Sequence, residues 1–171
     1  LQPKLELHAF YGFDNIDKLI AGGSKGFQKA KDEILKWAEQ PGVTLHGRMS
    51  QPELYREWFK SGIYCYPTNF WETSHISGME AMCMGAIPVF TPIWAQIENL
   101  QFGVAILGNP DEPLTRARFA AELAMLASQP ERQEQIRQQM MSISRLNWNW
   151  ERFVDQWEHD MSGVIPSGSC G

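Results

Sequence analysis

The chain has 171 residues, a length that fits one domain or a part of a larger one. Hydrophobic residues make up 43% and charged residues 20%. These values exclude general disorder, which needs low hydrophobicity and high net charge. The formal net charge is −5, so no basic face for duplex nucleic acid is expected. No apolar run reaches the ~20 residues of a membrane span, and we expect no transmembrane segment.

The cysteines and the N-terminal residues bear on the cellular compartment. The opening LQPKLELHAF lacks the features of a signal peptide and an initiating Met, which is typical of a cut piece or a processed product. Cys65, Cys83 and Cys170 are odd in number and too widely spaced for a disulfide framework or a zinc site. We therefore expect packed thiols and a cytoplasmic location, with peripheral membrane association of a longer protein as an open alternative.

Strand and helix patterns alternate along the chain. Leu5, Leu7 and Ala9 alternate with polar residues and predict a strand with one buried face. Ser50 and Glu53 have the spacing of a capping box at the start of a helix. The expected elements are strands at 5–13, 43–47, 63–67, 87–90 and 103–107, and helices at 27–38, 51–62, 76–85, 93–100, 115–129, 131–146 and 148–161.

This alternation predicts an α/β fold, a Rossmann-like and mostly parallel sheet with helices on both faces. Ligands of such sheets bind beyond the carboxyl ends of the strands. We therefore expect the chemistry at residues 47–50, 67–78 and 90–94. The glycine-rich run at 22–26 lacks the spacing of a phosphate loop and predicts a turn instead.

The loop after the third strand holds the most suggestive residues. Glu72 and Glu80 are eight positions apart, which on one helix would be ~12 Å of rise, too far for a paired action. The spacing favours Glu72 in the loop and Glu80 on the following helix. The start of that helix, near Ser74 to Ser77, offers backbone amides to a phosphate.

The order of these motifs resembles a known family. The sequence has ETSHISGME, an E-x7-E motif, followed by AMCMG and AIPVF. VTLHGRMSQPELYREWFKSG precedes it, and NWERFVDQWE follows near the C-terminus. From Leu5 to Trp157 the chain resembles the C-terminal, nucleotide-sugar-binding domain of retaining GT-B glycosyltransferases of the family-four, group-one type.

The resemblance implies roles for individual residues. Glu80 would bind the ribose hydroxyls, and Glu72, the catalytic candidate, would lie beside the donor sugar. The amides of Ser74, His75 and Ile76 would hold the diphosphate, and Gly47, Arg48 and Met49 would line the base. The donor would be a nucleotide diphosphate sugar. The sequence has no D-x-D, GT-B enzymes generally work without a metal, and we expect no metal or other cofactor.

Two departures from the family pattern matter. Thr73, Ser74 and His75 stand where the family usually has glycine. The family's diphosphate-binding Arg and Lys would lie upstream of Leu5. The resemblance thus implies that residues 1–162 are a donor-binding domain without its first β/α unit and without the N-terminal acceptor domain, and that 163–171 are a flexible tail. Such a fragment is expected to be inactive alone.

Plainer interpretations stay open for each residue. Glu80 could form a capping box with Ser77, and Glu72 could be a solvated loop acid. His75 could be a base or a partly exposed loop residue, and His46 a ligand or a packed side chain. Trp148, Trp150, Trp157 and Phe153 favour a helix packed on the sheet over a sugar platform. Alternative functions are a GT-B-shaped sugar-nucleotide epimerase and a non-catalytic nucleotide- or protein-binding module.

Overall fold

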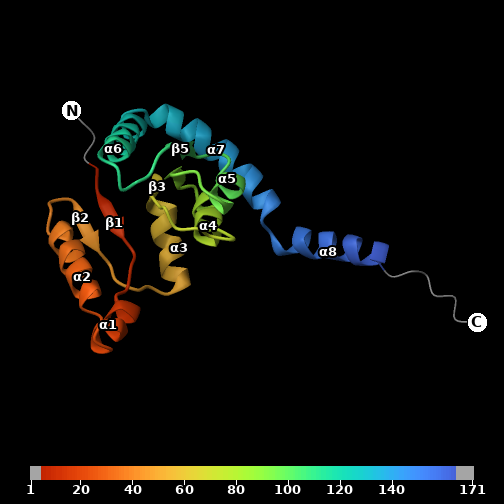
Figure 1. Cartoon of the computed structure of the whole chain (residues 1–171). Coiled ribbons are helices and arrows are strands. Elements are labelled where there is room, and N and C mark those ends of the chain that lie inside the picture. The colour runs from red at the N-terminus through yellow and green to blue at the C-terminus, as the bar shows by residue number, and fades with distance from the viewer. Residues whose placement is uncertain (1–4, 165–171) are drawn as a thin grey trace, which may run out of the picture. The chain divides into compact units, whose positions relative to one another are not determined.

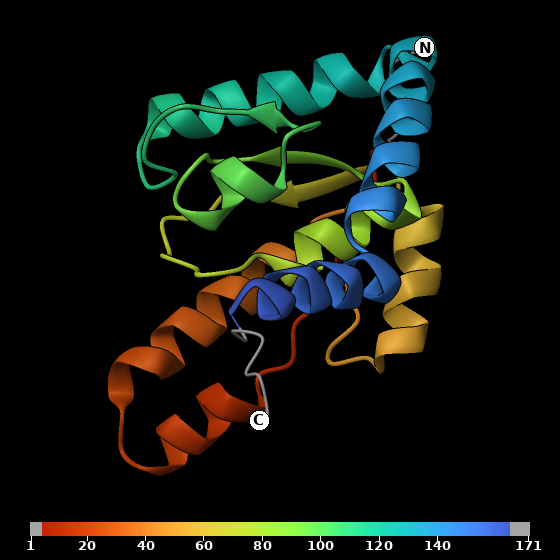
Figure 2. The same cartoon turned by 90° about the vertical axis from the view of Figure 1, so that its right-hand side faces the viewer.

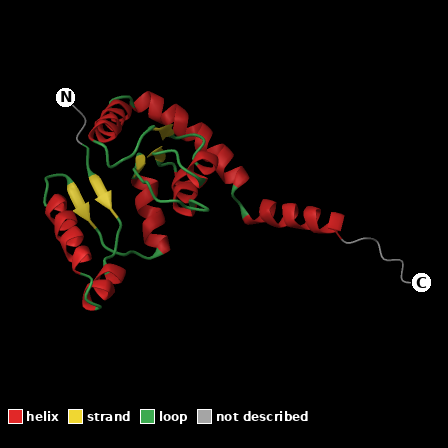
Figure 3. Cartoon of the chain, viewed as in Figure 1, coloured by secondary structure: helices red, strands yellow, loops and turns green. Residues whose placement is uncertain are grey.

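The computed structural model describes residues 5–164, in which helices alternate with strands (Figures 1 and 3). Every strand pairing in this range is parallel, which confirms the predicted α/β class. The chain divides into two compact units, Leu1–Glu57 and Trp58–Gly171, which are described separately below. No helix in the described range is both long and apolar enough to cross a membrane.

The first unit holds a small parallel sheet and its helices. Its elements are β1 (Leu7–Ala9), α1 (Asp14–Ala21), α2 (Lys25–Ala38) and β2 (Val43–Leu45), followed by α3 (Gln51–Lys60), which continues into the second unit. β1 pairs with β2, with Leu7 opposite Val43. Glu53 accepts hydrogen bonds from the backbone N (3.0 Å) and the hydroxyl (2.6 Å) of Ser50, so the carboxylate half of the predicted capping box is present.

Two predictions for this unit were wrong. The strand expected over 5–13 ends at Ala9, and the unpredicted α1 begins five residues later. Asp14 and Asp17 stabilise the first turn of α1 through the helix dipole. This favours a helix there, although the strand pattern of the sequence continues up to that point. Leu7 was expected on the buried face of the strand, but its side chain is 52% exposed.

The second unit is built on a three-stranded sheet. β3 (Ile63–Tyr66), β4 (Ile87–Phe90) and β5 (Val104–Ala105) lie in the order β3-β4-β5, and α4 (Ile76–Met84) and α5 (Ala95–Asn99) connect them. The central strand β4 is buried throughout, as its continuous apolar sequence requires. Gly85, at φ +98°, ends α4 in the left-handed conformation that glycine adopts without strain.

Three further helices complete this unit: α6 (Pro113–Ala127), α7 (Pro130–Asn147) and α8 (Trp150–Val164). α6 and α7 both begin with proline, which is preorganised for the first helical position. The buried core is contributed by Met82, Ile87, Val89, Phe90, Leu100, Ile106, Phe119, Leu126 and Met140. α4 and α6 pack against α7, and α6 and α7 also contact β4.

The last helix differs from the prediction of a helix packed on the sheet. Trp148 packs against the core, but Trp150 and Trp157 are 78% and 60% exposed. α8 extends beyond the end of α7, away from the three-stranded sheet in Figure 1 and in front of it, toward the viewer, in Figure 2. The expected flexible tail begins at Gly163, which is still within α8, and residues 165–171 lie outside the described range.

Candidate functional site

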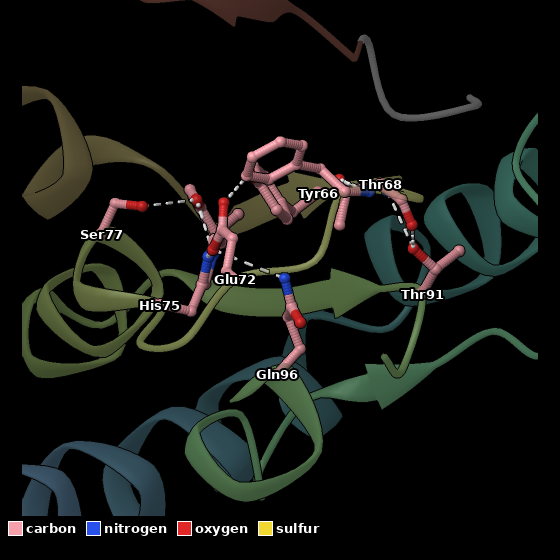
Figure 4. Close-up of polar contacts among 9 residues, drawn as sticks. Tyr66, Thr68, Glu72, His75, Ser77, Thr91 and Gln96 are labelled. Carbon is pink, nitrogen blue, oxygen red and sulfur yellow. Dashed lines mark hydrogen bonds and ion pairs between the residues drawn. The ribbon is translucent and has the colours of Figure 1, made fainter. Parts of the chain in front are cut away.

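The loops that follow β3 and β4 are tied together at the carboxyl ends of these strands. Thr91 accepts a hydrogen bond from the backbone N of Thr68 (2.8 Å) and donates its hydroxyl to the carbonyl oxygen of the same residue (Figure 4). The parallel pairing of β3 with β4 brings the two loops to one edge of the sheet. Two of the three segments in which chemistry was expected therefore meet here.

Glu72 is the centre of a polar network between these loops. Its Oε1 accepts a hydrogen bond from the Tyr66 hydroxyl (2.5 Å), and its Oε2 accepts one from His75 Nδ1 and a long one from Gln96 Nε2 (3.5 Å) (Figure 4). The side chain is 20% exposed. A carboxylate has about four acceptor positions, so about one remains for a ligand. The interpretation as a solvated loop acid is wrong, because the carboxylate is bound from three elements.

This network keeps Glu72 ionised. Burial alone would raise the pKa of the carboxyl group, but hydrogen bonds from Tyr66 and His75 and the electrostatic attraction of His75 outweigh it. The pKa of Glu72 is consequently lowered from its ordinary value of 4.5. Burial in turn raises the pKa of Tyr66, and the neighbouring carboxylate adds to this effect. Tyr66 is therefore a stable hydrogen-bond donor to a charged acceptor.

His75 is buried rather than partly exposed. It is 1% exposed and occupies the position just before the first residue of α4. Its ring packs over Gly78, where an added Cβ would overlap both the ring and Leu100. Ionised Glu72 can only accept, so Nδ1 of His75 carries a proton. Nε2 lies 3.1 Å from the Tyr64 hydroxyl, and the chain of contacts continues from there.

Tyr64 connects His75 to Ser77 in the first turn of α4, the helix that also holds Glu80. Its hydroxyl lies 3.2 Å from Ser77 Oγ. Its pKa is raised to about 12, foremost by burial and further by the charges of Glu72 and Glu80. Both carboxylates therefore lie within electrostatic range of one tyrosine. Ser77 is the second residue of α4 and Glu80 the fifth, so they do not have the cap and third positions of a capping box.

The first backbone amides of α4 meet no hydrogen-bond acceptor from residues 5–164. No side chain caps the helix at His75. Among the described residues, none accepts a hydrogen bond from the amides of Ser74, His75 or Ile76. Ser74 and Ile76 are exposed. Uncapped amides at a helix start carry partial positive charge and bind anions.

The residues expected to line the base lie in the first unit. Gly47 has φ +73°, a conformation that favours glycine, at the bend after β2. Arg48 and Met49 line a pocket of about 310 Å³, together with Phe10, Tyr11, Gly12, Asp14, Asn15 and Leu54. His46 is exposed but paired, because its ring stacks on Phe10 and its Nε2 lies 2.8 Å from Nδ1 of His8.

A larger groove in the same unit lies between α1 and α2. Its volume is about 720 Å³, and its lining includes Lys25, Lys29 and Lys36. Residues 22–24 of the glycine-rich run form the turn between the two helices, as predicted, whereas Lys25 and Gly26 already belong to α2. Lys29 is already paired with Glu33 at 4.0 Å, and the groove also contains Asp32. Its mixed charge makes it a weaker candidate than the loops at the carboxyl ends of β3 and β4.

Three residues of the network were not predicted: Tyr64, Tyr66 and Gln96. The two tyrosines are separated by one residue in a strand, so they share a face, and the period-2 pattern carries that information. Gln96 is fully buried, and its Oε1 has no hydrogen-bond partner in the described structure. No sequence pattern marks it, because its position depends on how the loop before α5 turns.

No group of three or more His, Cys, Asp or Glu side chains within residues 5–164 is placed to hold a metal ion. No protein-family model matches the chain, and no curated protein sequence matches it. The network around Glu72 and the free amides of α4 are thus the basis for a functional assignment.

Proposed function

We propose that the chain is the donor-binding half of a retaining glycosyltransferase that uses a nucleotide diphosphate sugar. One observation carries this proposal. A fixed, ionised carboxylate and an uncapped helix start lie together beyond the carboxyl end of β3. In parallel α/β sheets this is the edge at which ligands bind.

The diphosphate is assigned to the amides of Ser74, His75 and Ile76. The sequence contains no lysine or arginine between Lys60 and Arg116, so the start of α4 is the main positive group of this stretch. When the bond between the sugar and the diphosphate breaks, negative charge develops on the leaving diphosphate. Amides already aimed at that position stabilise the charge without reorganisation.

The two carboxylates have different roles in this proposal. Glu80, half-buried on α4, accepts hydrogen bonds from the two ribose hydroxyls. Glu72 lies beside the donor sugar, where its remaining acceptor position can bind a sugar hydroxyl. We expect this chain alone to bind the nucleotide weakly and to transfer no sugar, because it supplies few cations for the diphosphate.

Calorimetric titration with UDP, GDP, ADP and their sugars tests this assignment. One of the three nucleotides should bind, and Glu80→Gln should weaken its binding by about 1.5–3 kcal/mol, the contribution of hydrogen bonds to a charged group. Glu158→Gln, an exposed position on α8, is the matched control and should bind as the wild type does. Equal affinity of Glu80→Gln and wild type would contradict the role of Glu80, and the absence of nucleotide binding would contradict the proposal.

The alternative functions separate by product. A sugar-nucleotide epimerase would use the same donor but return an epimerised sugar nucleotide. A non-catalytic module would bind the nucleotide without turnover in any longer form of the protein. Product analysis with a longer form, in which Glu72→Ala should lower kcat/KM by roughly 10- to 1000-fold, distinguishes these alternatives from transfer.

A further inference from the structure

Two exposed tryptophans lie beside the network and have no role in the proposed donor site. Trp71 in the loop after β3 is 71% exposed, and Trp94 just before α5 is 60% exposed. Their ring centroids are 5.4 Å apart, with 33° between the ring planes. Large apolar side chains gathered on a surface mark binding sites more often than chance. We call these residues the tryptophan pair.

The backbone holds the tryptophan pair in place at a cost. Trp94 has φ 46° and ψ −128°, a region that bulky residues avoid and that glycine adopts readily. The two residues that follow Trp94 are anchored to Glu72: its carbonyl oxygen accepts from the amide of Ala95 (3.4 Å), and its carboxylate accepts from Gln96. Strain that a surrounding network maintains is typical of ligand-binding positions.

The chemistry of the surroundings selects the ligand. The two rings lie against each other, so no cation fits between them, and only their outer faces are available. From 61 to 115 the sequence has five carboxylates, Glu72, Glu80, Glu98, Asp111 and Glu112, and no lysine or arginine. Arg116, which follows this stretch, donates a hydrogen bond to the carbonyl oxygen of Asp111 (2.7 Å). Anionic lipids and sulfated glycans are therefore disfavoured.

A neutral sugar ring suits both the flat outer faces of the indoles and the excess of carboxylates. Its C–H bonds pack on an indole face, and its hydroxyls can donate to nearby carboxylates. We propose that the tryptophan pair is a carbohydrate-binding surface for a ring of a neutral oligosaccharide. This goes beyond the donor site, and it needs no bound nucleotide.

The test titrates the whole chain, without nucleotide, with maltohexaose, cellohexaose, chitohexaose and mannohexaose. Tryptophan fluorescence and calorimetry follow the binding. At least one of these oligosaccharides should bind, and Trp71→Ala and Trp94→Gly should each lower its affinity about tenfold or more. Trp94→Gly suits the local backbone, so this variant should remain folded, which its thermal unfolding checks. Trp150→Ala, at a 78% exposed position on α8, is the control and should bind within about twofold of wild type.

Several results would overturn the proposal. They are no binding of any of the four oligosaccharides at millimolar concentration, equal affinity in the wild type and both variants, or stronger binding of dextran sulfate than of the neutral sugars. Two further results would assign the surface to another partner if no oligosaccharide binds. One is binding to phosphatidylcholine–phosphatidylserine vesicles, and the other is self-association in sedimentation, in each case abolished by Trp71→Ala. Nucleotide titration of Trp71→Ala keeps the two proposals separate, because donor binding should be unchanged.

Discussion

The two units of the chain both combine helices with parallel strands, but they differ in how many side chains they bury. Among residues 5–57 of the first unit none is fully buried, and Leu5, Leu7 and Trp37 are about half exposed or more. In the second unit β4 is buried throughout, and Met82, Val89 and Met140 are 0% exposed. A parallel pair of short strands with its few helices does not enclose a core here, whereas three strands with helices around them do. The same sequence periodicity therefore gives elements of unequal stability.

The largest expected effect compares one leucine from each unit. Leu126 of α6 is 1% exposed, and Leu19 of α1 is 45% exposed. Leu126→Ala leaves a cavity and should lower the free energy of unfolding by about 2–5 kcal/mol. Leu19→Ala should cost about 1 kcal/mol or less, because the side chain is half in water. Urea denaturation followed by circular dichroism measures both, and similar losses would contradict the comparison.

A second comparison uses one carboxylate from each unit. The folded pKa of Glu72 is below its ordinary value, so the ionised group stabilises the fold above about pH 5, and this contribution is lost as pH falls through the folded pKa. Glu72→Gln should cost about 1.5–3 kcal/mol at pH 7.

The difference in free energy of unfolding between wild type and Glu72→Gln should shrink as the pH falls. Denaturation at pH 7 and at low pH measures this difference. Glu53 of the first unit also has a lowered pKa, owing first to the hydroxyl of Ser50, but it is exposed. Glu53→Gln should therefore give a much smaller pH-dependent difference. A Glu72→Gln effect that is constant with pH would show that the ionised form has no special stability.

A third comparison replaces one helical glycine in each unit. Gly78 of α4 has no room for a Cβ, whereas Gly26 of α2 has nothing within 4 Å of one. Gly78→Ala should destabilise by about 1–3 kcal/mol because the ring of His75 must move. Gly26→Ala should stabilise by about 0.5–1 kcal/mol through reduced chain entropy. Thermal unfolding of the two variants decides this, and a stable Gly78→Ala protein would place His75 elsewhere.

The smallest expected effect concerns two exposed tryptophans. Trp94→Gly removes backbone strain in the second unit and should raise the stability by about 1 kcal/mol, since the side chain buries little. Trp37 lies within α2, and Trp37→Gly should cost about 1 kcal/mol because glycine is a poor helix former. Opposite shifts in melting temperature are predicted. A drop for Trp94→Gly would show that the tryptophan is retained for stability rather than for binding.

Local sequence patterns predicted much of the second unit. The strand at 87–90 has the predicted bounds, and the helix that Gly85 ends begins where the sequence placed it. Continuous apolar runs, glycine caps and capping boxes are encoded within a few residues of each other, so one sequence suffices to find them.

The site was predictable only in part. Glu72 and His75 were named from their loop, but their pairing and the burial of His75 were not predicted. Those depend on Tyr66 from β3, Gln96 from α5 and the missing side chain of Gly78, which the fold brings together. In the first unit α1 was missed, because the alternating pattern before it continued past the last residue that pairs in the sheet.

Amide NMR of the chain during titration with a nucleotide sugar tests the central claim most directly. If the start of α4 holds the diphosphate and Glu80 the ribose, the amide signals of Ser74, His75, Ile76 and Glu80 should shift first and most. Shifts confined to the groove between α1 and α2, at Lys25 and Lys29, would place the anion there instead and contradict the proposed donor site.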